Sequence, residues 1–414
     1  MGNPAPPQVL CFGEALVDRL LPVGEPLPAP GCGGGPEPGG RTQAAEGLAD
    51  IAGEASLLGP GDGGDRLGGA PANVACALAR LGTPAAFLGR LGSDAIGEAF
   101  ELLFAERGVE TSGLQWDAER PSRVVLVRRD AYGERSFGGF LGDRGAGFAD
   151  QALDAEVLQQ AAAPLLVRAR WLLCGSLLWA SPPAASALEG VLAMVEAAGR
   201  RADAGATDAG ATDARQSSAQ ESSSRRPPFL AVDVNWRPTF WGLPAGTAPP
   251  AAVQERIRPL LERAALLKCA TEEALWFFAS DNPSAISSAL PGRPAVCVTD
   301  GPAPVRWFLG GRSGQLAPFA IDAVDTTGAG DAFMAGLLHG LCQAEADPHT
   351  VVEPEALLRF AAACGSLVCC GAGAIDPQPR AAEVERFLAT RGGVSTTVEH
   401  HPAVGPEACS SGAG

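Results

Sequence analysis

The chain has 414 residues, a length that allows one large domain or two to three small ones with a substantial core. Its formal net charge of −16 at pH 7 argues against nucleic acid and anionic membranes as partners, because both repel an acidic surface. No apolar run approaches the roughly 20 residues of a membrane span. The eleven cysteines form no C-x-x-C pair, so we expect reduced thiols and a cytoplasmic protein. A plastid location is expected only if the protein has a transit peptide that this chain does not include.

Near the N-terminus, residues 9–18 are predicted to form one short buried strand that ends in Gly13, Glu14 and Asp18. Ligands of open α/β sheets bind at the carboxyl ends of strands, so Asp18 is well placed for a polar substrate. A solvated strand end is the alternative. The Pro- and Gly-rich stretch at about 24–50 cannot bury a core and is predicted to be a disordered insertion.

A glycine pair, Gly68 and Gly69, precedes Asn73 and a predicted helix that ends at Gly82. The glycines allow the backbone to approach a ligand closely. The Asn73 amide offers both a donor and an acceptor to a hydroxyl group. An ordinary position near a helix N-terminus is the alternative for Asn73.

Strand and helix patterns then alternate to the end of the chain, after a predicted hairpin at 123–140. This alternation indicates an α/β fold with a doubly wound, mainly parallel sheet flanked by helices. Residues 200–228, rich in Ala, Asp and Ser, are predicted to be a second disordered insertion, and the tail at 393–414 is predicted to be disordered. The other predicted strands lie at 171–174, 229–234, 266–270 and 295–299, and the helices at 152–163, 183–199 and 355–368.

Two of the strand ends carry charged residues suited to a ligand site. The strand that begins at Phe229 ends in Asp-Val-Asn-Trp-Arg, and Arg237 presents a guanidinium fork suited to phosphate. A plain surface arginine is the alternative. Lys268, the lone lysine, lies in the next strand, and Glu272 follows in the first turn of a helix. A carboxylate that serves only the helix dipole is the alternative for Glu272.

The most informative stretch is Asp325-Thr-Thr-Gly-Ala-Gly-Asp331, which precedes an apolar run with helical spacing. Its Gly328, Ala329 and Gly330 should lie at a helix N-terminus, where free N–H groups and the macrodipole attract phosphate. Asp331, in the first helical turn, faces the same spot. A phosphate cradle beside a carboxylate suits phosphoryl transfer to a hydroxyl. An aspartate that merely caps the helix is the alternative.

The motif from Asp325 to Phe333 resembles the C-terminal signature of the PfkB (ribokinase-like) family of carbohydrate kinases. Residues 68–75, Gly-Gly-Ala-Pro-Ala-Asn-Val-Ala, resemble its N-terminal signature. The sequences of these motifs are most similar to those of fructokinases. The resemblance implies that residues 1–392 form one sugar kinase domain, with a small β-sheet lid from about 18–68 and 119–142.

The resemblance also assigns roles to individual residues. Asp331 would be the general base, and the transferring phosphoryl group would be held by Gly328, Ala329, Gly330 and Arg237. The sugar would be bound by Asp18, Gly68, Gly69, Asn73 and Arg123. ATP would be bound by Lys268, Thr299, Gly301 and Ala374. Glu272 would hold Mg²⁺ through water, and Asp325 and Thr327 would line a monovalent-cation site, with K⁺ as the candidate ion.

The activity that the resemblance implies is the ATP-dependent phosphorylation of a small sugar, D-fructose to D-fructose 6-phosphate. Ribokinase and 2-keto-3-deoxygluconate kinase are the alternatives within the family. A non-catalytic fructokinase-like protein is the alternative from another class, although such a protein has no reason to keep Asp331 and the Gly-Ala-Gly sequence. The expected partners are the sugar and ATP, with no nucleic acid and no membrane, and a homodimer is an expected assembly.

Overall fold

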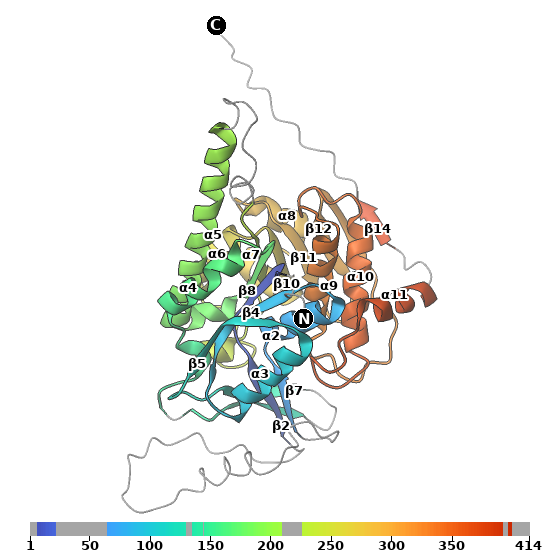
Figure 1. The fold of residues 1–414 in the computed structure, drawn as a ribbon. Helices are drawn as coiled ribbons and strands as arrows, with labels where there is room; N and C mark the ends of the chain where they lie inside the picture. Colours follow the sequence, from blue (N-terminus) through green and yellow to red (C-terminus); the bar gives the residue numbers. More distant parts are fainter. Residues whose placement is uncertain are drawn as a thin grey trace, which may run out of the picture.

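The computed structural model describes residues 6–21, 64–129, 135–143, 145–208, 226–391 and 396–399. Within these ranges the strands form a ten-stranded sheet and a separate four-stranded sheet (Figure 1). The order of the large sheet is β14-β13-β12-β11-β10-β9-β8-β1-β4-β5. Its strands are β1 (Val9–Phe12), β4 (Ala85–Gly92), β5 (Glu110–Asp117), β8 (Trp171–Gly175), β9 (Phe229–Asp233), β10 (Leu266–Ala270), β11 (Ala295–Thr299), β12 (Val305–Leu309), β13 (Arg312–Leu316) and β14 (Thr396–Glu399).

The large sheet is parallel from β5 to β11 and antiparallel from β11 to β14. Helices cover both of its faces. One layer is α2 (Ala70–Leu81), α3 (Ala95–Arg107), α9 (Ala329–Gln343), α10 (Pro354–Val368) and α11 (Ala381–Thr390). The other is α4 (Ala155–Leu166), α5 (Pro182–Asp208), α6 (Ala251–Glu262), α7 (Thr271–Phe278) and α8 (Pro283–Ala289). Short turns η1 (Ala149–Gln151), η2 (Ser176–Ala180) and η3 (Pro238–Trp241) precede α4, α5 and α6 respectively. The predicted doubly wound, mainly parallel fold is confirmed.

Strand β1 shows why its sequence is continuously apolar. Val9 and Cys11 belong to the core beneath α2 and α9, whereas Leu10 and Phe12 belong to the core beneath α4 and α5. All four side chains are fully buried. A strand covered by helices on both faces has no side that faces water, so its sequence does not alternate between apolar and polar residues.

The small sheet is the predicted β lid and lies at one end of the body (Figure 1). Its strand order is β3-β2-β6-β7, with β2 (Leu16–Leu21), β3 (Asp65–Gly68), β6 (Arg123–Arg129) and β7 (Arg135–Leu141). The prediction of one strand over 9–18 is wrong, because the body strand ends at Phe12 and the chain enters the lid at Leu16. Residues 14–17 are as well buried as those of β1, so hydrophobicity alone does not reveal the break. Asp18 therefore reaches the cavity from the lid.

The segments predicted to be disordered fall mostly outside the described residues. The insertion at about 24–50 lies wholly outside them. In the insertion at 200–228, however, α5 continues to Asp208. In the tail, β14 pairs antiparallel with β13, so the prediction of disorder is wrong at 396–399. The open edge of β13 supplies the backbone hydrogen-bonding groups that this pairing needs.

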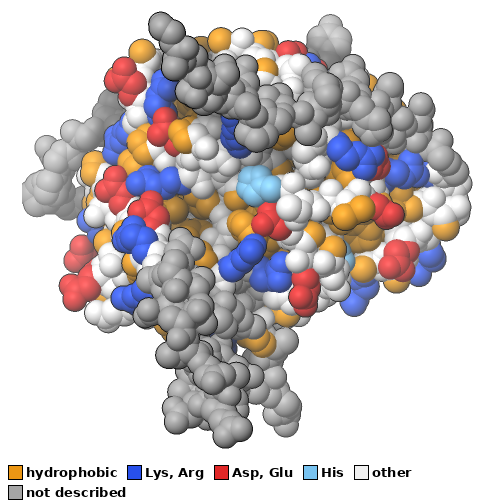
Figure 2. Space-filling model, turned by 90° about the horizontal axis from the view of Figure 1, so that it is seen from above, with side chains coloured by type: hydrophobic (Ala, Val, Ile, Leu, Met, Phe, Trp, Pro, Cys, Tyr) orange, Lys and Arg blue, Asp and Glu red, His pale blue; other side chains and the backbone are white. Residues whose placement is uncertain are grey.

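On the face seen in Figure 2, acidic and basic side chains of the described residues are interspersed with apolar ones. Among the described helices, none has both the length and the apolar composition needed to cross a membrane.

Helix α3 offers a direct test of the packing. Phe100 is fully buried and its ring lies 5.6 Å from that of Phe104, whereas Leu102, on the same helix, is 72% exposed. Phe100→Ala should lower the free energy of unfolding by about 3–5 kcal/mol, because it leaves a cavity in the core. The control Leu102→Ala should change it by less than about 0.5 kcal/mol. Denaturant unfolding of both variants measures the difference, and equal effects would contradict the described packing of α3.

Candidate active site

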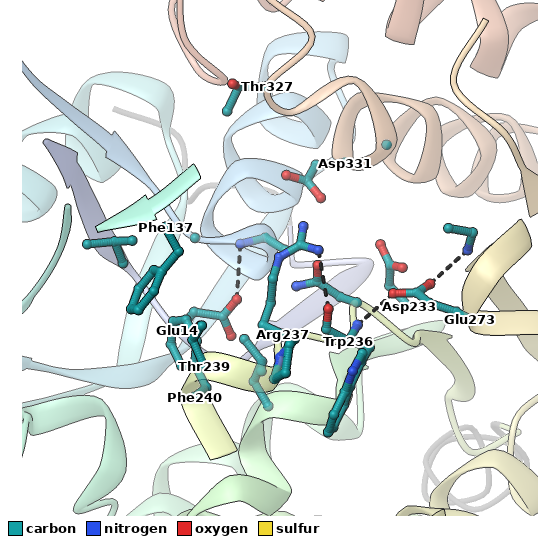
Figure 3. A pocket seen from close by; sticks show the side chains of 18 of the residues that line it. Glu14, Phe137, Asp233, Trp236, Arg237, Thr239, Phe240, Glu273, Thr327 and Asp331 are labelled. Atoms are coloured by element: carbon teal, nitrogen blue, oxygen red, sulfur yellow. Dashed lines mark hydrogen bonds between the residues drawn. The ribbon is translucent and has the colours of Figure 1, made fainter. Parts of the chain in front are cut away.

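A cavity of about 650 Å³ lies between the lid, the carboxyl ends of the parallel strands and the N-terminus of α9. The lid contributes Leu16, Asp18, Val125 and Phe137, and the loop after β1 contributes Glu14. Asp233 and Lys268 come from the central strands β9 and β10. The remaining lining includes Gly69, Asn73, Arg237, Phe240, Glu272, Glu273, Thr327, Gly328, Gly330 and Asp331. Much of the predicted site thus converges on one cavity (Figure 3).

The Gly-Ala-Gly sequence forms the first turn of α9, as predicted. Gly328 precedes the helix in a left-handed conformation, with φ of 76°, and an added Cβ would lie 2.5 Å from the Cβ of Ala374. At Gly330, an added Cβ would lie 3.1 Å from Lys268 Nζ. Backbone conformation and close neighbours therefore both favour glycine here. The first amides of a helix have no partner within it and can meet an anion, although the N–H of Ala329 donates a 3.3 Å hydrogen bond to the carbonyl oxygen of Thr326.

Asp331 lies in this first turn and points into the cavity (Figure 3). Its Oδ2 accepts a hydrogen bond of 2.7 Å from Nδ2 of Asn73, a residue of α2. Burial raises the pKa of Asp331, and the carboxylate of Asp233 adds to the rise, while Lys268, Asn73 and Arg237 oppose it. A carboxylate with a raised pKa is a better proton acceptor near neutral pH.

Asn73 has a second feature that bears on ligand binding. Its amide oxygen, Oδ1, is buried and has no hydrogen-bond partner in the described part of the chain. An unpaired buried acceptor is unfavourable, so such a group usually meets a ligand or water. The amide thus holds Asp331 with its nitrogen and leaves its oxygen for a hydroxyl.

A buried ionic network lies beside the cradle. Lys268 Nζ donates a 2.7 Å hydrogen bond to Asp233 Oδ2, and both side chains are buried. Burial alone would lower the pKa of Lys268, but Asp233 and Asp331 raise it above its ordinary value. Lys268 therefore remains a cation next to Gly330. The neighbouring Glu273 accepts from the backbone N–H of Trp236 at 2.6 Å and of Ala270 at 2.7 Å, which fixes the loop after β9 against α7.

Arg237 and Glu272 line the same end of the cavity. Arg237 is exposed and directly precedes the short η3 turn, and its Nη1 donates a 3.4 Å hydrogen bond to the carbonyl oxygen of Trp236. Asn235, two residues earlier, has φ of 41°, a conformation that asparagine tolerates better than most residues. In the described chain, no three His, Cys, Asp or Glu side chains lie close enough together to form a metal site of their own.

The other end of the cavity combines lid residues with the start of α2. Gly69 has φ of 100°, and an added Cβ would lie 2.5 Å from the carbonyl oxygen of Glu14. An added Cβ at Gly68 would lie 3.3 Å from Asp18 Oδ2. The glycine pair therefore lets the lid and α2 approach closely beside Asp18 and Asn73.

Arg123 lies outside the described lining of this cavity, contrary to the expectation that it contacts substrate. It is only 3% exposed, and two of its nitrogens, Nε and Nη2, each donate a 2.8 Å hydrogen bond to Asp150. The rings of Phe140, Phe148 and Phe240 surround its guanidinium at 4.3–4.7 Å. The sequence could not reveal this, because Asp150 is 27 residues away and follows no recognisable motif.

Of the residues assigned to ATP and to a monovalent cation, some line the cavity and others lie outside its described lining. Lys268 lines the cavity, whereas Thr299, Gly301 and Ala374 lie outside its described lining. Asp325 is buried and accepts hydrogen bonds from the N–H and hydroxyl of Thr327 and from the N–H of Gly373. The Asp325 carboxylate thus ties the cradle loop to residues 373–374.

Several lining residues were not singled out from the sequence. Glu273, Trp236, Phe137 and Phe240 all line the cavity. The resemblance assigned Mg²⁺ to Glu272, and Glu273 follows it in the first turn of the same helix. Only the fold shows that Glu272 is exposed and Glu273 is buried. The aromatic residues come from three separate elements, so no local pattern links them.

Glu14 provides a test of the electrostatics. It is only 7% exposed, and its Oε1 accepts a 3.2 Å hydrogen bond from Ala70 N. Burial raises the pKa of Glu14 from 4.5 to about 7, and the carboxylates of Asp150 and Asp331 contribute, while backbone hydrogen bonds oppose the rise. The folded state therefore binds its proton more tightly, and stability is lost as the pH rises from 4.5 through 7.

We expect Glu14→Gln to be more stabilising, or less destabilising, at pH 8 than at pH 5.5, because the variant has no buried charge to form. The difference between the two pH values should be on the order of 2 kcal/mol. Unfolding free energies of wild type and variant at both values measure it. A pH-independent difference would show that Glu14 titrates normally.

A family model described as pfkB family carbohydrate kinase matches residues 47–181 and 228–381. Fructokinase from Klebsiella pneumoniae is 30% identical over 338 residues, which cover 79% of this chain and 94% of that protein. Fructokinase-2 from Zea mays is 29% identical over 325 residues, covering 78% and 85% respectively. The crystal structure of a fructokinase from Xylella fastidiosa with bound ATP matches with a TM-score of 0.66 and 28% identity, covering 93% of this chain and 99% of that one.

The matched regions contain both signature motifs and most of the strands that form the cavity. The family resemblance seen in the sequence is confirmed. The chain belongs to the pfkB family of carbohydrate kinases and is an ATP-dependent sugar kinase.

Proposed function

We propose that the chain phosphorylates D-fructose to D-fructose 6-phosphate with ATP as the donor. The observation that carries this proposal is the position of Asp331, which points into the cavity from the first turn of α9 and is held by Asn73. A carboxylate beside a helix N-terminus suits transfer of a phosphoryl group to a hydroxyl. Fructokinases at 29–30% identity support fructose as the sugar.

In the proposed mechanism, Asp331 accepts the proton of the sugar hydroxyl as the hydroxyl oxygen attacks the terminal phosphorus of ATP, and the bond from that phosphorus to the bridging oxygen breaks to release ADP. The Asn73 hydrogen bond occupies Oδ2, which leaves Oδ1 for the hydroxyl. The raised pKa of Asp331 favours proton transfer. Asp18, Gly68, Gly69 and the amide oxygen of Asn73 would hold the sugar on the lid side.

The N–H groups of Gly328, Ala329 and Gly330 would hold the transferring phosphoryl group, and Arg237 would neutralise part of its charge. Preorganised donors of this kind stabilise the charge that develops in the transition state. Lys268 would contribute positive charge next to Gly330. Lys268, Thr299, Gly301 and Ala374 remain the proposed contacts of ATP.

The residues present also fit a divalent cation, because carboxylate oxygens are the ligands that Mg²⁺ prefers. Glu272, which lines the cavity at the phosphate end, would hold Mg²⁺ through water. When bound, the ion would neutralise charge on the phosphates of ATP. Asp325 and Thr327 would line a monovalent-cation site, with K⁺ as the proposed ion, since Asp325 already gathers two loops at the base of the cradle.

The decisive variant is Asp331→Asn. Asparagine keeps the size of the side chain and its N-terminal polarity, so stability should change little. If Asp331 is the base, turnover with fructose should fall by about 10²–10⁴-fold. Affinities for ATP and fructose should change much less, because the cradle amides and Asp18 remain.

The same exchange at the exposed Asp322 is the control and should leave turnover unchanged. Turnover, nucleotide affinity and melting temperature should be measured together. Near-normal turnover in Asp331→Asn would exclude it as the base. An unfolded variant would instead assign Asp331 a structural role.

A further inference from the structure

The cation best placed to recognise an acidic sugar is already neutralised. Arg123 is buried beside the sugar end of the cavity, and Asp150 binds it through two hydrogen bonds of 2.8 Å. Such a two-point contact uses the N–H groups on the edge of the guanidinium that would otherwise bind a substrate carboxylate. The rings of Phe140, Phe148 and Phe240 cover much of the rest.

The space around Arg123 is also too small for a substrate group. A side pocket of about 20 Å³ is lined by Arg123, Asp150, Glu14 and Ser181. That volume is enough for about one water molecule but not for a carboxylate. Glu14 and Phe240 line both the side pocket and the main cavity, so they separate Arg123 from the ligand space.

The main cavity is lined by side chains of both charges, among them those of Glu14, Arg237, Asp233 and Asp331 (Figure 3). Among the described lining residues, the cations are Arg237 and Lys268, and Lys268 is paired with Asp233. Both belong to the end that we assign to phosphate. Carboxyl groups line the sugar end, namely Glu14 and Asp18. A sugar carboxylate placed there would lose hydration and gain no cationic partner, which is unfavourable.

We propose that this site selects neutral sugars and excludes sugar acids, and that Asp150 is the residue that enforces this choice by cancelling the charge of Arg123. The inference rests on the proposed function, in which the hydroxyl at C6 of the sugar meets Asp331. In that arrangement we place the C1 group at the far end of the sugar, on the side of the cavity lined by Glu14, which also lines the side pocket of Arg123 and Asp150. Of the alternatives within the family, the inference excludes 2-keto-3-deoxygluconate kinase, whose substrate carries a carboxylate at C1.

A matched pair of ligands tests the proposal on the wild-type protein. D-Fructose and 2-keto-D-gluconate have the same skeleton and stereochemistry, but C1 is an alcohol in the first and a carboxylate in the second. Titration calorimetry with a non-hydrolysable ATP analogue present should show that fructose binds at least about 100-fold more tightly than 2-keto-D-gluconate. Affinities within threefold of each other, or tighter binding of the acid, would overturn the proposal.

The variant Asp150→Asn should weaken this discrimination by about tenfold or more, since Arg123 stays between its three aromatic rings but loses its counter-ion. Glu14 also lines the side pocket and, when ionised, could act as the counter-ion of Arg123 in place of Asp150. The double variant Glu14→Gln/Asp150→Asn should therefore weaken the discrimination between fructose and the acid further. The control Asp154→Asn changes an exposed N-cap residue of α4 and should leave the ratio unchanged. A ratio that stays at the wild-type value in folded Asp150→Asn and in the double variant would remove Asp150 from the selection.

Including D-ribose separates this proposal from the proposed function. Binding and phosphorylation of ribose but not fructose would overturn the choice of fructose and leave the exclusion of acids intact. Efficient phosphorylation of both fructose and 2-keto-D-gluconate would support fructose as a substrate and overturn the exclusion of sugar acids. If the Asp150 variants do not fold, the wild-type comparison still decides whether sugar acids are excluded.

Discussion

The hydrogen bond between Asn73 and Asp331 is the interaction on which the site depends, because it joins two halves of the chain that lie 258 residues apart. It lies where the N-terminal turns of α2 and α9 meet, and the two helices pack against each other. A second polar contact, between the Thr83 hydroxyl just beyond α2 and Nδ1 of His339 in α9, spans 2.8 Å. The position of the Asp331 carboxylate is therefore set by helix packing, which is stiffer than a loop.

The lid is joined to this rigid part by contacts of a different kind. Arg123 begins β6 in the lid, and its partner Asp150 lies in η1 of the body. Phe140 of the lid packs against Phe240 of η3, with ring centroids 5.1 Å apart. A buried, fully hydrogen-bonded ion pair is geometrically specific even where its net contribution to stability is small. The Arg123–Asp150 pair thus links the lid to the body directly beside the cavity.

The sequence predicted what short-range patterns can encode, and little else. The cradle at Gly328–Gly330, the helix that follows and the doubly wound sheet were all predictable from glycine placement and hydrophobic spacing. The passage of the chain from β1 into the lid was not, since residues 14–17 are buried like the strand before them. The pairing of Arg123 with Asp150 was not predictable either, because a side chain that faces a partner cannot be told from one that faces a ligand without the fold.

The distribution of charge explains how so acidic a chain can bind an anionic nucleotide. Global repulsion is screened within about 10 Å at ordinary ionic strength, whereas groups inside a cavity act at close range in a medium of low polarity. Lys268 keeps its proton because Asp233 and Asp331 surround it, and it lies beside the first amides of α9. Different carboxyl groups, those of Glu14 and Asp18, line the other end of the cavity and make it unfavourable for a second anion. One arrangement therefore combines cationic and helix-terminal groups suited to phosphate with carboxyl groups that line the rest of the cavity.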